Sequence, residues 1–318
     1  MSMITSPICK ILGIQYPVFQ GGMAWVAEAN LAAAVSNAGG LGIIAAGDAS
    51  AEWLAEQIRL AKTLTDKPFG VNVMLLGRHV QAVAQAVAAE QVPVVTTGAG
   101  NPSQFMKLWT EAGIKVIPVV PSCGLAKLAE RCGASAVIAE GGESGGHIGE
   151  LTTMALVPQV VDTVSIPVIA AGGIADGRGI AAALMLGATG VQLGTSFLVA
   201  TECQVHQNYK DKVIAAKDID TIATGRRLGH PVRSLKTAFS REYYAKEHDR
   251  NVSDDQMKGM SSGALRLAVV EGDTKKGCFL AGQIAGLVKK EQSAAEIIAD
   301  LMRGTEAALN GASQWLRG

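Results

Sequence analysis

The chain has no excess of charge of either sign. Among its 318 residues, 28 lysines and arginines balance 28 aspartates and glutamates, and only 18% of residues are charged. A protein with zero net charge has no global field that attracts polyanions or anionic lipid. We therefore expect no nucleic-acid partner and no membrane partner, and the low charge content argues against a disordered chain.

Long apolar runs are also absent. No segment approaches the roughly 18 uninterrupted apolar residues that a membrane-spanning helix needs. Residues 1–7 contain no basic run followed by an apolar block, so we expect no signal peptide. Together these absences predict a cytoplasmic protein.

Cysteine is scarce and scattered. The five cysteines are odd in number and form no C-x-x-C pair. Cys123 and Cys132 lie too far apart for the common metal-binding spacing. We expect reduced thiols that pack as small hydrophobic side chains.

Apolar, β-branched runs recur along the first two thirds of the chain. Each run is continuously apolar rather than alternating, which is typical of parallel strands buried on both faces. Strands are predicted at residues 16–20, 42–46, 69–74, 92–97, 115–120, 136–140, 166–171 and 190–193. Segments with helical spacing lie between them, at residues 51–65, 80–90, 103–112, 124–132 and 179–186. This repeated strand–helix unit predicts an α/β fold, the (β/α)8 TIM barrel.

The pattern changes after Thr201. The next region is polar and lacks strand-like runs, and short helices are predicted at residues 203–211, 233–245 and 253–260. Further helices are predicted at residues 282–290, 293–301 and 304–316, with Ser293 and Glu296 forming a capping box. We therefore expect a barrel over residues 1–200, a helical cap over 201–267, and C-terminal helices over 268–318 that pack back on the barrel.

Two glycine-containing turns follow the seventh and eighth predicted strands. The seventh strand ends at Ala171 and runs into Gly172 and Gly173, and the eighth runs into Gly194 and Thr195. Glycine lets main-chain N–H groups approach an anion, and a helix N-terminus behind the turn adds a favourable dipole. In TIM barrels these two loops build a phosphate site. The sequence predicts a phosphate-bearing ligand, with two ordinary tight turns as the alternative.

A lone histidine stands among glycines after the sixth strand. Within residues 140–149, glycines surround His147, whose imidazole can donate or orient a proton near neutral pH. We take His147 as the candidate catalytic residue, with a loop histidine bonded to a carbonyl as the alternative. Glu140 and Glu143 lie nearby, but the spacing is not H-E-x-x-H, so no metal is expected.

The first and third strands carry two further features. Residues 20–26 contain glycines that would let the backbone lie flat against a planar ring. Asn72 is a polar residue inside an apolar strand, so its side chain needs a partner if it is buried. A ring edge and a loop of a neighbouring strand are both open as that partner.

These segments together resemble a known family. The chain is similar over nearly its whole length to the flavin-dependent barrels that comprise nitronate monooxygenases and enoyl-acyl-carrier-protein reductase II. Position 140 is commonly glutamine in the monooxygenase branch, so Glu140 favours the reductase branch. The matching segments are residues 20–26, 67–74, 96–102, 117–122, 138–149, 170–198 and 281–287.

The resemblance implies an FMN-dependent oxidoreductase of fatty-acid elongation. Such an enzyme uses NADH or NADPH to reduce a trans-2-enoyl thioester borne by acyl carrier protein, and His147 would stand over the reactive face of the flavin. The residues that the resemblance places around FMN are Gly22, Met23, Ala24, Asn72, Glu140, Gly145, Ala171, Gly172, Gly173, Gln192, Gly194 and Thr195.

Other expectations stay open beside this one. A nitronate monooxygenase that oxidises nitroalkanes with oxygen is one alternative function, and a non-catalytic flavin- or phosphate-binding sensor is another. Residues 257–265 resemble a part of the family that can hold a monovalent cation, and a homodimer is expected because two-fold dimers are the commonest assemblies. Basic residues of the cap, if they do not form a solvated helix face, would dock the carrier or the dinucleotide: Arg226, Arg227, Arg233, Lys236 and Arg241.

Overall fold

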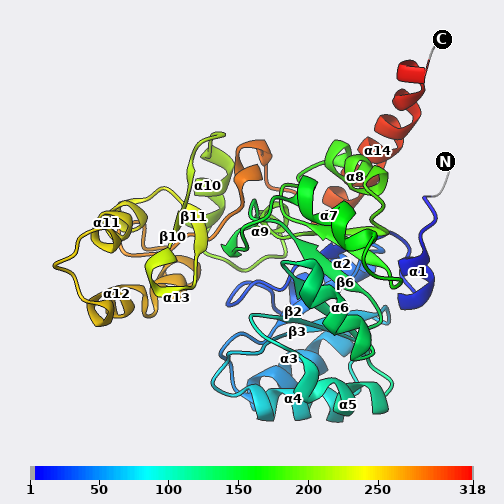
Figure 1. The fold of residues 1–318 in the computed structure, drawn as a ribbon, viewed down its shortest axis with the longest axis horizontal. Coiled ribbons are helices and arrows are strands. Elements are labelled where there is room, and N and C mark those ends of the chain that lie inside the picture. Colours follow the sequence, from blue (N-terminus) through cyan, green and yellow to red (C-terminus); the bar gives the residue numbers. More distant parts are fainter. Residues whose placement is uncertain (1–3, 317–318) are drawn as a thin grey trace.

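Eight parallel strands form a single curved sheet in the computed structural model, which describes residues 4–316 (Figure 1). Residues 1–7, where no signal peptide is expected, lie partly outside this range. The strand order is β1-β9-β8-β6-β5-β4-β3-β2. The bounds are β1 (Val18–Gln20), β2 (Gly42–Ala45), β3 (Phe69–Met74), β4 (Val94–Gly98), β5 (Lys115–Val120), β6 (Val137–Glu140), β8 (Val168–Ala171) and β9 (Gly190–Leu193).

The two ends of this sheet meet and close the barrel. Phe19 forms a parallel bridge with Leu41, whose N–H donates to Val18 O and whose carbonyl accepts from Gln20 N. All eight predicted strands are present, and the predicted (β/α)8 barrel is confirmed. Closure leaves no free sheet edge and places every strand's carboxyl end on one face.

Helices surround the barrel and begin and end where the sequence predicts local caps. The Oγ atoms of Ser50 and Ser122 accept hydrogen bonds from the first turns of α3 and α6. Gly113, Gly133 and Gly187 follow α5, α6 and α8 with positive φ. The bounds are α1 (Pro7–Leu12), α2 (Ala29–Asn37), α3 (Ala51–Leu64), α4 (Val80–Ala89), α5 (Ser103–Glu111), α6 (Cys123–Arg131), α7 (Thr153–Val161), α8 (Gly177–Met185) and the short α9 (Thr195–Leu198).

Two apolar cores hold these layers. A large core lies between the strands and the outer helices, and a second fills the barrel interior, where α1 contributes Ile8 and Leu12. The interior core also contains strand residues, namely Phe19, Ile43, Val94, Ile117, Ile138 and Ile169. Because α1 seals the end where the strands begin, the carboxyl end is the end left for a ligand.

All five cysteines are free thiols. Burial raises the pKa of Cys9, Cys203 and Cys278 to about 11, so these thiols stay protonated and are poor nucleophiles near neutral pH.

The cap contains a small sheet, so the expectation of a purely helical insertion is wrong. Strands β10 (Thr221–Thr224) and β11 (Val232–Leu235) pair antiparallel, and β11 pairs with β7 (Gly146–His147) from the barrel. The helix predicted over residues 233–245 therefore starts as a strand. The local sequence does not predict β11, because the hydrogen-bond partners that stabilise this strand lie in distant segments. The other elements are α10 (Gln207–Ala215), the 3-10 turn η1 (Arg226–Leu228), α11 (Ala238–Glu247), α12 (Asp254–Ser261) and α13 (Ala264–Val269).

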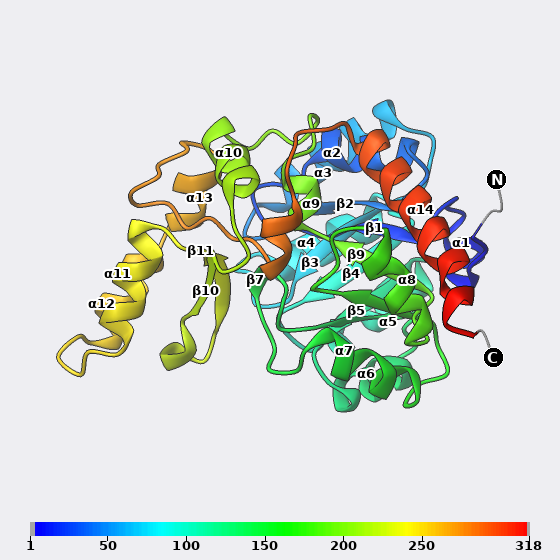
Figure 2. The same cartoon turned by 90° about the horizontal axis from the view of Figure 1, so that it is seen from above.

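The C-terminal segment returns to the barrel as expected, with altered boundaries. It forms a 3-10 turn, η2 (Gln283–Leu287), and one continuous helix, α14 (Ala294–Gly311), followed by η3 (Ala312–Leu316), where separate helices were predicted. The capping box of Ser293 and Glu296 is confirmed. Figure 2 shows α14 running beside α8, at the opposite end of the molecule from the cap helices α11 and α12. Within residues 4–316, no helix is both long enough and apolar enough to cross a membrane.

Candidate active site

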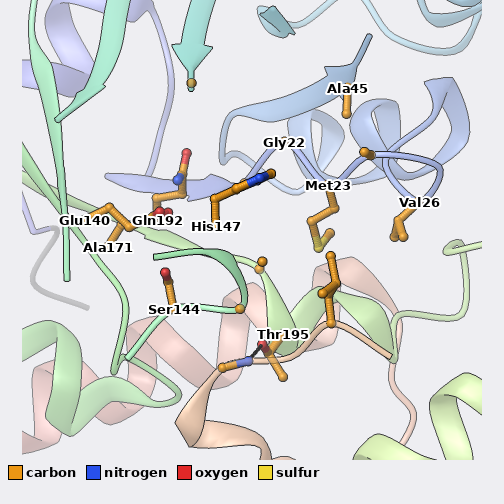
Figure 3. Close-up of a pocket in the computed structure, with 18 of the residues that line it drawn as sticks. Gly22, Met23, Val26, Ala45, Glu140, Ser144, His147, Ala171, Gln192 and Thr195 are labelled. Carbon is orange, nitrogen blue, oxygen red and sulfur yellow. Dashed lines mark hydrogen bonds between the residues drawn. The ribbon is translucent and has the colours of Figure 1, made fainter. Parts of the chain in front are cut away.

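A cavity of about 400 Å³ opens at the carboxyl ends of the strands. Its walls come from the ends of several barrel strands, from β7 and from the segment before η2 (Figure 3). A cavity at this face is where TIM barrels carry their active sites. Every residue predicted for the site lines it: Gly22, Met23, Ala24, Asn72, Glu140, Gly145, His147, Ala171, Gly172, Gly173, Gln192, Gly194 and Thr195.

At one wall of the cavity, Gly22 lies directly against the side chain of Asn72. A Cβ atom on Gly22 would lie 2.3 Å from Cβ of Asn72, so any larger residue would push this wall apart. Asn72 Oδ1 accepts a hydrogen bond from Thr96 Oγ1 at 2.9 Å. A neighbouring strand thus supplies one partner for Asn72, and the side chain still faces the cavity.

The glycine turn after β8 presents unused amides. Gly172 and Gly173 have φ of 88° and 71°, a conformation that favours glycine. Within residues 4–316, the N–H groups of Gly172, Gly173 and Gly194 donate to no acceptor. Unpaired backbone donors at a cavity wall form an anion-binding concavity.

The helix behind this turn, α8, has a capped amino end. The first turn of α8 is capped by Asp176, whose carboxylate accepts from Arg178 N at 2.9 Å. A Cβ atom on Gly177 would lie 2.1 Å from the backbone of Gly304, so this end of α8 packs against α14. The Asp176 carboxylate also pairs with the Arg178 side chain at 2.6 Å, so the contribution of the α8 dipole to anion binding stays a prediction. The short helix α9 also lies next to the cavity.

Glu140 ends β6 with its side chain in the cavity wall. Desolvation raises the pKa of this carboxyl to about 7. The Ser144 hydroxyl counters part of the shift; it approaches the carboxyl without reaching normal hydrogen-bond geometry and has no other partner. Glu140 therefore changes protonation state near neutral pH.

His147 lies on a strand rather than on a free loop. Its backbone pairs with Val232, and the next residue, Ile148, donates from its N–H to Pro231 O at 3.0 Å. Desolvation lowers the pKa of the imidazole, and the nearby His230 lowers it further. The ring is therefore neutral at neutral pH and can offer one N–H and one lone pair.

Three of the five basic residues predicted to dock a partner make contacts within the chain. Arg226 pairs with Glu150 at 2.7 Å, and Arg227 pairs with Asp254 at 2.9 Å while also donating to two carbonyls of the cap. Arg233 donates from Nε and Nη2 to Gly142 O, at 3.2 and 2.9 Å. Arg226 and Glu150 are both exposed, as are Lys236 and Arg241, so docking of the carrier or the dinucleotide at these residues stays a prediction.

Several lining residues were not predicted. Trp25 lies in the cavity wall half exposed, with φ of 66°, which is strained for a bulky residue. Tyr209 of α10 is buried and donates from its hydroxyl to Leu280 O at 2.7 Å, and Gly282 N donates to Thr195 Oγ1 at 2.9 Å. Trp25 could have been found from its place beside Gly22; the others had no local signal. Among the described residues, no group of three or more His, Cys, Asp or Glu could hold a metal.

The fold and the cavity define a class of protein: a TIM-barrel enzyme whose site lies at the carboxyl ends of the strands and offers amides to an anion. The nitronate monooxygenase family model matches residues 5–90 and 77–304. The chain belongs to the nitronate monooxygenase family.

Three known proteins illustrate the range of this likeness. FabK from Thermotoga maritima has 47% sequence identity and a TM-score of 0.96, covering 98% of this chain and 99% of its own. A nitroalkane oxidase from Streptomyces ansochromogenes has 29% identity and a TM-score of 0.85, covering 96% and 99%. A hydroxy-methyl-oxo-octahydro-indene-carboxyl-CoA dehydrogenase from Mycobacterium tuberculosis is 33% identical, covering 94% and 95%.

The family consists of FMN flavoproteins that act as oxidoreductases. The chain is therefore a flavin-dependent oxidoreductase. This result removes the alternative of a non-catalytic sensor barrel.

Proposed function

We propose that the protein is an FMN-dependent enoyl-acyl-carrier-protein reductase that uses NADH or NADPH. The observation that carries the proposal is the likeness to FabK, an enoyl-acyl-carrier-protein reductase II, at 47% identity over 98% of the chain. The likeness to the nitroalkane oxidase is lower, at 29% identity. The mycobacterial relative is named for a carboxyl-CoA substrate, which is also a thioester. Glu140, the residue that favours the reductase branch, supports the same choice.

The residues around the cavity fit FMN. The free amides of Gly172, Gly173 and Gly194 suit its phosphate, and Gly22, which has no side chain, leaves room at the wall for a ring. When bound, FMN supplies the hydride-transfer chemistry. Side chains that would hold the edge of the ring are those of Asn72, Glu140 and Gln192.

The overall reaction moves one hydride from NAD(P)H to the β-carbon of the enoyl thioester and one proton to its α-carbon. Negative charge develops on the thioester oxygen after the hydride has reached the β-carbon, and it is discharged when the α-carbon takes up a proton from solvent. His147 is neutral, so its ring N–H would donate a hydrogen bond to that oxygen. The pairing of β7 with β11 holds the backbone of His147, which limits the positions that the imidazole can take.

Several partners belong to the same proposal. The substrate is carried by acyl carrier protein, and the enzyme acts as a homodimer. A monovalent cation would be held by backbone carbonyls of residues 257–265, and its test is a comparison of potassium and sodium salts in the reductase assay. We place the protein in the cytoplasm, where acyl carrier protein is loaded with its acyl group.

The deciding experiment is an anaerobic assay of NADH and NADPH oxidation with a crotonyl thioester. The reductase proposal expects oxidation that depends on both the thioester and FMN. A parallel oxygen-electrode assay uses a nitroalkane without NADH. Oxygen uptake there, with no thioester-dependent oxidation, would show a nitronate monooxygenase, the second candidate that the family match favours.

Replacing His147 with alanine tests the role of the imidazole. Turnover of the crotonyl thioester should fall by about 100-fold or more, since a positioned proton donor typically contributes about 10²–10⁴-fold. Affinity for FMN, measured by fluorescence titration, should stay within about twofold because the phosphate amides are untouched. Unchanged turnover would remove His147 from the mechanism.

A further inference from the structure

A buried hydroxyl lies directly behind the glycine turn. Thr153 is the first residue of α7 and is 8% exposed. Its Oγ1 lies 2.9 Å from Gly172 O, 3.2 Å from Ala171 O and 3.0 Å from Glu143 Oε2. A hydroxyl has one proton, so it can donate to only one of these three acceptors at a time.

Glu143 fixes the threonine and leaves that proton for a carbonyl. Both of its carboxylate oxygens accept from Thr153 N, each at 3.0 Å. The carboxylate sits at the amino end of α7, where the helix dipole favours a negative charge. The carboxylate keeps its contacts with the backbone N–H while the hydroxyl donates to Gly172 O, which at 2.9 Å is the nearest of its acceptors.

Fixing this carbonyl also fixes the next amide. In a planar trans peptide, the C=O of Gly172 and the N–H of Gly173 point in opposite directions. With Gly172 O turned back toward Thr153, the Gly173 N–H turns the other way, and Gly173 lines the cavity. Two successive glycines can rotate this peptide at little steric cost, so the turn by itself does not choose the orientation.

We propose that Thr153, held by Glu143, is a positioning residue that keeps the Gly173 amide directed at the phosphate of the flavin. The inference rests on the FMN site of the proposed function and is independent of the substrate. Without the hydroxyl, the peptide can flip and present a carbonyl oxygen to the phosphate, which repels it. Thr153 therefore contributes to recognition of the phosphate and does not affect the contacts with the flavin ring.

Riboflavin, which lacks the phosphate, makes the test specific. The dissociation constants of FMN and riboflavin are measured on apoprotein by fluorescence titration, for wild type and for Thr153→Val, which keeps the shape and removes the hydroxyl. We expect FMN affinity to fall about tenfold, as for the loss of one hydrogen bond to a charged ligand site, with riboflavin affinity within about twofold. Thr153→Ser should restore the preference for FMN.

The neighbouring Thr152 gives a matched control. Its side chain is exposed and makes no cap hydrogen bond, so Thr152→Val should leave both affinities unchanged. Equal losses for FMN and riboflavin in Thr153→Val, or no loss, would overturn the proposal. A wild type that binds FMN without reducing the thioester would overturn only the proposed reductase activity, because the affinity comparison would still stand.

Discussion

At the scale of single residues, the site contains two titratable side chains, Glu140 and His147, whose pKa values are shifted in opposite directions. Burial raises the pKa of the Glu140 carboxyl to about 7 and lowers the pKa of the His147 imidazole. In both cases desolvation is the largest cause, and it disfavours the charged form. Both groups are therefore largely uncharged just below neutral pH.

Glu140 makes a prediction about stability and pH. Its folded pKa of about 7 exceeds the ordinary value of 4.5, so the folded state binds more protons between these two values. Stability from this group is fully present below about 4.5 and is lost as pH rises through about 7. Melting temperatures of apoprotein across this range should decline less in Glu140→Gln than in wild type. Parallel curves for the two proteins would contradict the assigned shift.

At the scale of elements, the cap sheet holds the backbone of His147, the predicted catalytic residue. Strand β7 is only two residues long, and its partner β11 comes from the cap. Arg233 of β11 extends this pairing by donating twice to Gly142 O. The loop that carries His147 is thus fixed from outside the barrel, so the cap has a direct part in the geometry of the active site.

Substitution of Arg233 tests this role of the cap. Replacing Arg233 with lysine keeps the positive charge but removes the two guanidinium N–H groups that donate to Gly142 O. Turnover of the thioester should fall by about tenfold or more, because small displacements of a catalytic group are costly, while FMN affinity should hold. Steady-state kinetics and flavin titration check the two parts. Arg241→Lys, at an exposed position of α11, is the control; equal effects in both variants would show that the grip on Gly142 is unimportant.

At the scale of the whole molecule, a buried ion pair joins the cap to the C-terminal segment. Lys210 of α10 lies 2.6 Å from Glu291 Oε1 and donates to Ala200 O at 2.8 Å. The lysine side chain is only 5% exposed, whereas that of Glu291 is 32% exposed. This pair connects α10 to the chain just before α14.

Removing one partner of this pair should destabilise the protein. Lys210→Met leaves the carboxylate of Glu291 without its cation, and we expect the free energy of unfolding to fall by about 3 kcal/mol, at the low end for buried pairs because Glu291 reaches solvent. Urea denaturation measures the change. The double variant Lys210→Met, Glu291→Gln should recover part of the loss. A single variant as stable as wild type would show that the pair contributes nothing.

The sequence alone determined the barrel and most of the site. Eight continuously apolar runs require strands buried on both faces, and parallel strands bring their carboxyl ends to one face, so the glycine turns and Asn72, Glu140 and His147 had to converge. Only the tertiary structure decided how these residues are held. The strand that fixes His147, the contacts that occupy the cap arginines, and the hydroxyl of Thr153 behind Gly172 all depend on partners far away in the chain. Local patterns do not record such partners, because a hydrogen bond or ion pair leaves no periodicity in the sequence.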